Sequence, residues 1–304
     1  MTIKFFILCL SAIFYGLLIA YIVPYWSFDY DALVSSAIYY RTNGPGSFLG
    51  LLGNNVVLLY IWDYTFGFLT PTVSVAFLYG FAAAVRLLVL FSLFRFRFCL
   101  PLFLATAVFN DLNVCRYSLT LSFMLLTLDR LGPVKASVIF FPLHIFMPAT
   151  IFMLSVWSRY WRVAIVAVIF LMIIILPEVF TRHFNVIDGE LFPRIAYVYI
   201  MLACIVLLAF RKELSKNIFN FKALIIGLTL FNFAEVPFGN AYYFRFSNLA
   251  FESSLLLVAW HHARLEHVST TKPFSLKFGI YIAVCFLAGV YSFILIGGNI
   301  WRFF

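Results

Sequence analysis

FFILCLSAIFYGLLIAYIV, residues 5–23, is an uninterrupted apolar run that directly follows the charge of Lys4. An α-helix of about 20 apolar residues crosses the hydrocarbon core of a bilayer, so the run predicts a membrane helix. It is longer than the core of a signal peptide and has no small-x-small cleavage site, and we therefore predict a first helix that is not cleaved. Similar apolar segments recur along the chain, which predicts an all-α, polytopic transmembrane bundle.

The composition points to the same class of protein. Of 304 residues, 64% are hydrophobic, 20% are aromatic and 11% are charged, and the mean hydropathy is +1.03. No polar stretch is long enough for a separate soluble domain, so we predict a single integral membrane domain over residues 1–304. The net charge of +9 is spread over short loops rather than collected in one stripe, which argues against a nucleic-acid partner.

The placement of lysine and arginine predicts the orientation of the chain. Inner loops of membrane proteins are rich in basic residues. On this rule the inner clusters hold every lysine, together with part of the arginines: Lys4, Lys135, Lys212, Lys216, Lys222, Lys272, Lys277, Arg95, Arg97, Arg130, Arg159, Arg162, Arg211 and Arg264. The resulting topology has about eleven crossings, with the N-terminus inside and the C-terminus outside.

The basic residues that this topology leaves outside are all arginines: Arg41, Arg116, Arg182, Arg194, Arg245 and Arg302. The planar guanidinium binds phosphate through two parallel hydrogen bonds, whereas lysine offers a point charge. We therefore interpret the outer arginines as candidates for anion recognition.

Not every apolar segment is expected to cross the bilayer. Residues 48–68 carry polar side chains and would, as a spanning helix, place the Arg95 cluster outside, so we predict an amphipathic or re-entrant element at the outer interface. Residues 71–94 are expected to return inward. Further helices are predicted at 163–180, 194–210, 219–236, 246–260 and 279–296.

Two short hairpins are predicted between these helices. The first rises over 98–110, turns through Asp111, Asn113 and Arg116, and descends over 117–128. The second rises from Lys135 to a turn containing Pro142, His144 and Pro148, and descends to Arg159 and Arg162. Each limb of about 13 residues is too short to cross the hydrocarbon core, so we expect the hairpin tips to lie in a water-accessible cavity.

Charged residues at membrane depth are costly, which makes those at the hairpin tips the first functional candidates. We select Arg116 and His144 on this ground. Arg245 stands among aromatic residues and is left with two readings, a functional residue or an anchor in an interfacial aromatic belt. Asp29 and Asp31 are left with three readings, namely binding of sugar hydroxyls, action as a base, or binding of a metal. Two further residues within helices, Arg86 and Glu252, are expected to pair with each other or with the backbone.

Some residue types carry no predicted site. The cysteines stand singly in apolar surroundings and are interpreted as packing residues. The cluster of His261, His262 and His267 is interpreted as an inner loop, because no cysteine or paired spacing accompanies it. We predict neither a metal site nor a cofactor.

The order of these features resembles a known family. Asp29-Tyr30-Asp31 follows the first helix, an amphipathic stretch comes next, Asn113-x-x-Arg116 opens a helix, His144 lies at the next outer turn, and Arg245 lies near the last third. This order is similar to the EpsG branch of the Wzy-type bacterial polysaccharide polymerases.

The resemblance implies a GT-C-like glycosyltransferase of the bacterial inner membrane. Such an enzyme joins oligosaccharide repeat units carried on undecaprenyl diphosphate at the outer face, as in O-antigen, capsule or exopolysaccharide synthesis. Its expected partners are the lipid-linked glycan, membrane lipid, a flippase and a chain-length regulator. The site residues carried over are the diphosphate-binding Arg116, Arg245 and Arg182 and the candidate bases His144, Asp29 and Asp31.

Two other classes remain open. A transporter or flippase of lipid-linked sugars would also need outer arginines, but it is expected to have two similar halves, which the sequence does not display. Another membrane transferase, a ligase or an acyltransferase, would share part of the chemistry. An acyltransferase fed from the cytoplasm would depend on His261 and His262 rather than on His144.

Overall fold

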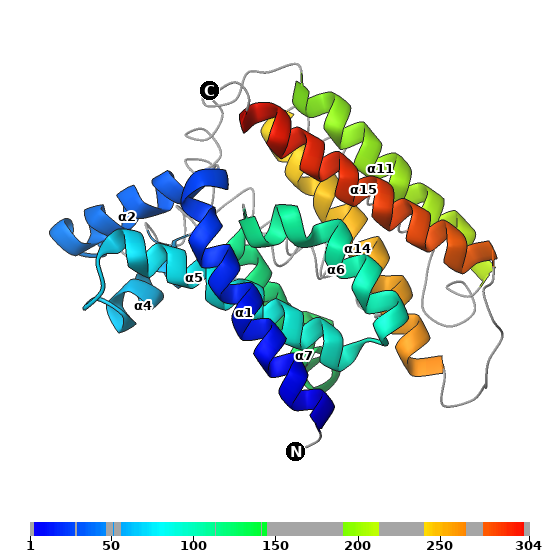
Figure 1. Cartoon of the computed structure of the whole chain (residues 1–304), viewed down its shortest axis with the longest axis horizontal. Coiled ribbons are helices and arrows are strands. Elements are labelled where there is room, and N and C mark those ends of the chain that lie inside the picture. Colours follow the sequence, from blue (N-terminus) through cyan, green and yellow to red (C-terminus); the bar gives the residue numbers. More distant parts are fainter. Residues whose placement is uncertain are drawn as a thin grey trace. The chain divides into compact units, whose positions relative to one another are not determined.

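The computed structural model describes residues 3–27, 29–46, 51, 56–112, 114–140, 142–144, 191–212, 240–265 and 276–300. All regular secondary structure in these ranges is helical, as the sequence predicts (Figure 1). The chain divides into two compact units. Unit 1 comprises Met1–Arg130, Ile139–Met147 and Gly289–Phe304, and unit 2 comprises Leu131–Val138 and Pro148–Ala288.

Three of the described helices are long and apolar enough to cross a membrane, which makes the chain a membrane protein. They are α1 (Ile3–Trp26), α5 (Pro71–Leu93) and α15 (Leu276–Ile300). Their positions confirm the helices predicted at 5–23, 71–94 and 279–296. Large apolar side chains on α1, such as Phe14 and Leu17, are exposed, which fits contact with lipid.

Helices α1 and α5 cross at two glycines, which lets their backbones approach closely (Figure 1). A β-carbon added at Gly16 would lie 2.6 Å from the carbonyl oxygen of Gly80, and one added at Gly80 would lie 2.5 Å from that of Gly16. On α1 the buried positions around this point are Ala12, Gly16, Ile19 and Val23. The close approach of the two backbones at Gly16 and Gly80 thus determines how α1 packs in unit 1.

Between α1 and α5 lie two short helices, α2 (Tyr30–Asn43) and α4 (Val57–Thr65). The described part of the predicted interfacial segment 48–68 therefore contains no spanning helix, because the nine residues of α4 extend only about 14 Å. The next span starts sharply, since the Thr70 side chain accepts a hydrogen bond from the Val73 amide and Pro71 occupies the first turn of α5.

The first predicted hairpin is confirmed. It consists of α6 (Phe96–Leu112) and the beginning of α7 (Cys115–Phe140), with a turn between them. Residues 129–135, where a basic inner turn is predicted, are helical, because α7 continues through them.

The chain nevertheless reverses direction within α7. A straight helix from Tyr117 to Phe140 would separate these residues by about 34 Å. The rings of Tyr117 and His144 are only 5.4 Å apart between centroids, so α7 must bend back sharply.

Unit 2 contains α11 (Leu191–Ala209), α14 (Asn240–Leu265) and the first half of α15, whose described parts lie side by side (Figure 1). Aromatic contacts join them, including Tyr199 with Phe251 at 5.4 Å and Phe210 with Tyr281 at 6.3 Å between ring centroids. The helices predicted at 194–210 and 246–260 are confirmed. Those predicted at 163–180 and 219–236, and the descent to Arg159 and Arg162, lie outside the described residues.

Candidate functional site

Unit 1 contains a buried ion pair at the end of α6. The Nη1 atom of Arg86 on α5 donates to Oδ2 of Asp111 at 2.8 Å, and the side chains are 2% and 0% exposed. The hydroxyl of Tyr15 on α1 donates to the same carboxylate at 2.7 Å. These contacts correct two expectations. Arg86 pairs with Asp111 rather than with Glu252 or the backbone, and Asp111 is enclosed by its partners rather than facing a water-accessible cavity.

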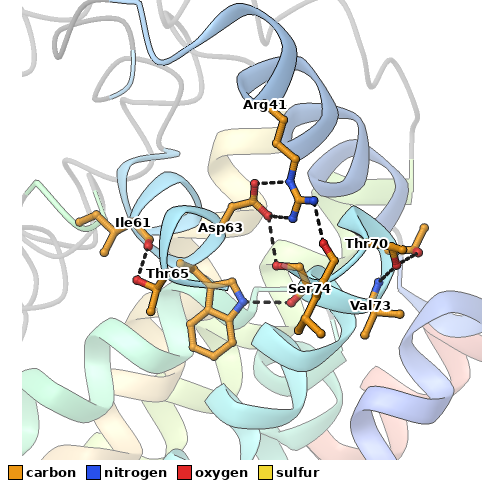
Figure 2. A network of polar contacts seen from close by, with 10 residues as sticks. Arg41, Ile61, Asp63, Thr65, Thr70, Val73 and Ser74 are labelled. Carbon is orange, nitrogen blue, oxygen red and sulfur yellow. Dashed lines mark hydrogen bonds and ion pairs between the residues drawn. The ribbon is translucent and has the colours of Figure 1, made fainter. Parts of the chain in front are cut away.

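A second ion pair joins α2 to α4 (Figure 2). Arg41 donates from Nε to Oδ2 of Asp63 at 2.7 Å and from Nη2 to Oδ1 at 2.5 Å, while its Nη1 donates to the carbonyl oxygen of Leu69 at 2.7 Å. Ser74 on α5 donates to the same carboxylate at 3.1 Å, and the Trp62 indole donates to the Ser74 carbonyl at 3.0 Å. The network fastens α2 and α4 to the beginning of α5.

These two pairs revise the interpretation of the arginines. Arg41 was counted among outer arginines suited to phosphate, but its fork already binds a carboxylate of the protein. The hydrogen bonds that Arg41 donates to Asp63 raise the pKa of the Arg41 guanidinium, so Arg41 keeps its charge. Anion recognition therefore has to be sought at the other arginines.

The Arg41 pair makes a testable contribution to stability. Lysine at position 41 keeps the positive charge but cannot form two parallel hydrogen bonds to Asp63. Because Arg41 is partly exposed, we expect Arg41→Lys to lower the free energy of unfolding by only about 1 kcal/mol. Thermal unfolding of the purified protein in detergent measures the change, with Arg130→Lys on an exposed position of α7 as the matched control. An unchanged midpoint for Arg41→Lys would contradict the assignment.

Two of the predicted site residues, Asp29 and Arg116, act on the same pair of buried side chains. Both charges act electrostatically on Tyr79 of α5 and on Cys115, the first residue of α7. The hydroxyl of Tyr79 lies 3.0 Å from Oγ of Ser27, just before Asp29 along the chain. Residues on both sides of the break between α1 and α2 and at the start of α7 thus act on Tyr79 of α5 within unit 1.

Asp29 and Arg116 are both partly exposed, whereas Tyr30, Cys115 and Tyr117 next to them along the chain are buried. Asp29 precedes the first residue of α2, but its carboxylate makes no capping hydrogen bond to that helix. A carboxylate usually caps when it occupies this position. The backbone of Asp29 is in the helical region rather than the extended region that capping requires, which accounts for the difference.

His144 belongs to the same end of unit 1. Its side chain is 6% exposed, and its ring meets that of Tyr117 edge to face at 5.4 Å between centroids. Tyr117 directly follows Arg116, so the bend in α7 returns the histidine to the beginning of the helix. The start of α7 thus carries Tyr117, which packs against His144, and Arg116, whose charge acts together with that of Asp29 on Tyr79 and Cys115.

The remaining predicted residues are not part of this group as far as the structure describes it. Asp31 is exposed on α2. Arg245 lies in α14 of unit 2, and its side chain is outside the described parts. Arg182 is outside the described residues altogether. Their predicted roles stay predictions.

Sequence reasoning missed Tyr79 and Ser27, because a tyrosine within an apolar helix gives no signal of its own. It could have found the Arg86–Asp111 pair, since opposite charges in neighbouring apolar segments are expected to pair. Within the described ranges, no group of three or more His, Cys, Asp or Glu side chains is arranged to hold a metal ion. No family model, curated protein or solved structure matches the chain.

Proposed function

We propose that this protein is a multi-pass glycosyltransferase of the bacterial inner membrane that polymerises lipid-linked glycan repeat units at the outer face. The observation that carries the proposal is that His144 packs against Tyr117, the residue after Arg116 at the start of α7. The charges of Arg116 and Asp29 both act on Tyr79 and Cys115, which supports it. The order of these residues along the chain is similar to that of the EpsG branch of Wzy-type polymerases, which names the substrate class.

Arg116 has the chemistry that the leaving group requires. The bond from the donor sugar to undecaprenyl diphosphate breaks in the reaction, and negative charge develops on the departing diphosphate. A guanidinium at a partly dry site stabilises this charge through two parallel hydrogen bonds. Arg116 is partly exposed beside buried neighbours, which suits contact with a substrate.

The attacking group is a sugar hydroxyl of the second lipid-linked unit. Its oxygen forms the new bond to the donor sugar, and its proton must pass to a base. Asp29 and His144 are the two candidates at this end of unit 1, and Asp31 is a third from the sequence. Arg245 and Arg182 are proposed as further diphosphate ligands. A flippase would supply the lipid-linked units, and a chain-length regulator would limit growth.

The proposal is tested by Arg116→Lys. In cells, loss of the protein should leave single lipid-linked repeat units in place of long chains. Arg116→Lys keeps the charge but loses the two-pronged contact, and we expect it to reduce polymerisation about a hundredfold or more. Gel analysis of the extracted glycan measures chain length. Binding of undecaprenyl diphosphate to the purified protein, compared with undecaprenyl monophosphate, measures the contact directly.

Arg130→Lys is the matched control, because Arg130 is an exposed arginine of the same helix. It should leave chain length and binding unchanged. Normal long chains with Arg116→Lys at wild-type protein levels would contradict the proposal. Repeat units that reach the outer face in wild-type cells but are absent there in the deletion strain would instead identify a transporter.

A further inference from the structure

The carboxylate of Asp111 joins four helices at the tip of the α6–α7 hairpin. It lies at the end of α6 and accepts hydrogen bonds from Tyr15 on α1 at 2.7 Å and from Arg86 on α5 at 2.8 Å. Ser118 on α7 makes a longer contact of 3.4 Å. Asp111 is fully buried, so these protein groups replace water around its charge.

The donors to Asp111 are themselves held in place. The guanidinium of Arg86 lies over the ring of Phe103, with Cζ 5.1 Å from the ring centroid, and its Nη2 donates to Oγ1 of Thr106. Thr106 in turn donates to the Leu102 carbonyl at 2.8 Å. The ring of Tyr15 packs edge to face on Phe103 at 5.1 Å between centroids. Each side chain around Asp111 therefore has a defined orientation.

We propose that Tyr15, Arg86 and Asp111 form a clamp that fixes the α6–α7 tip and thereby positions Arg116 for contact with the lipid diphosphate. The role given to Arg116 rests on the proposed function. Asp111 is followed by the turn that ends α6, and Arg116 is the second residue of α7, so few bonds separate the clamp from the guanidinium. None of the three clamp residues touches substrate in this proposal. They are positioning residues.

We infer that the clamp is polar because it orients the α6–α7 tip, and not because it makes the folded protein more stable. A buried ion pair loses the hydration of both charges, and well-packed apolar residues in its place often give a protein of equal or greater stability. Hydrogen bonds, unlike apolar contacts, have a direction. A displacement of about 1 Å at a reacting group lowers turnover by about a hundredfold, so a site that binds diphosphate needs this directional control.

The test replaces the whole clamp by apolar residues of similar volume, in the triple variant Tyr15→Phe, Arg86→Met and Asp111→Leu. This variant leaves no unpaired charge and is expected to fold. Amide hydrogen exchange over residues 111–118 reports on the tip without any substrate. We expect exchange there to be about tenfold faster or more, with exchange over α2 and α4 unchanged. We expect kcat for polymerisation to fall about a hundredfold with a smaller change in KM.

A second variant guards against failure of the triple variant to fold. Tyr15→Phe alone keeps the ring contact with Phe103 and the ion pair but removes one hydrogen bond, and it should show the same changes at a smaller amplitude. Tyr64→Phe removes a hydroxyl from an exposed position on α4 and is its control. Wild-type exchange at the tip in both clamp variants would overturn the inference. The other failure is also distinguishable. If amide exchange at the tip is slow in the wild-type protein and faster in the clamp variants, but the wild-type protein polymerises no repeat units, the proposed function is overturned and the clamp is not.

Discussion

Arg86→Met should lower the free energy of unfolding by about 3–5 kcal/mol, because it leaves the Asp111 carboxylate buried without its counter-charge. The desolvation of a carboxylate is compensated in the native protein by Arg86 and by the Tyr15 hydroxyl. Once Arg86 is gone, the single remaining strong hydrogen bond cannot balance the charge. Unfolding of the purified protein in mixed detergent micelles measures the loss.

The triple apolar variant described above supplies the decisive comparison. Since it removes both charges and the Tyr15 hydroxyl together, its stability should return to within about 1 kcal/mol of wild type. Arg130→Met makes the same substitution at an exposed position of α7 and should change stability by less than about 0.5 kcal/mol. A single Arg86→Met variant as stable as wild type would show that the ion pair does not form in the protein.

Gly80→Ala should destabilise the protein by about 1–3 kcal/mol, although alanine is the better helix former. The added carbon would lie 2.5 Å from the Gly16 carbonyl oxygen, a backbone atom that cannot move aside alone. The two helices must separate instead, and the contacts along α1 and α5 weaken together. Gly16→Ala should behave in the same way, because its β-carbon would lie 2.6 Å from the Gly80 oxygen.

Two other glycines provide a graded comparison by the same thermal unfolding measurement. A β-carbon at Gly289 on α15 would lie 3.3 Å from the Leu104 oxygen, so Gly289→Ala should have a smaller effect. Nothing lies within 4 Å of a β-carbon at Gly279, and Gly279→Ala should be neutral or stabilising by up to about 1 kcal/mol. Equal effects at Gly80 and Gly279 would contradict the crossing of α1 and α5 described here.

The helices that the sequence predicted best are those whose formation depends on local properties. Whether a run such as residues 5–23 forms a membrane helix depends on its own length and apolarity, and α1 confirms the prediction. The inner turn predicted near residues 129–135 relied on the charge of the basic residues. Helix hydrogen bonds continue through that region, and the reversal of α7 is seen only from the contact between Tyr117 and His144.

The sequence predicted some residues of the candidate site but not the ion pairs beside it. Arg116 and His144 could be chosen because charged and ionisable groups at membrane depth are costly and need a reason. Asp29 was a candidate with three open readings. The sequence does not show which arginines form ion pairs with carboxylates of the protein. Arg41 and Asp63 are separated by 22 positions and meet only because α2 and α4 pack on α5.

The sequence by itself determined that this chain is helical and embedded in a membrane, because apolar length and hydrogen bonding within each segment are local requirements. Only the tertiary structure decided the use of each charge. A guanidinium forms an ion pair with the carboxylate that helix packing brings next to it. Packing therefore determined that Arg86 pairs with Asp111 and that Arg41 pairs with Asp63. The same packing brought Tyr79, which no pattern in the sequence had marked, under the electrostatic influence of both Asp29 and Arg116.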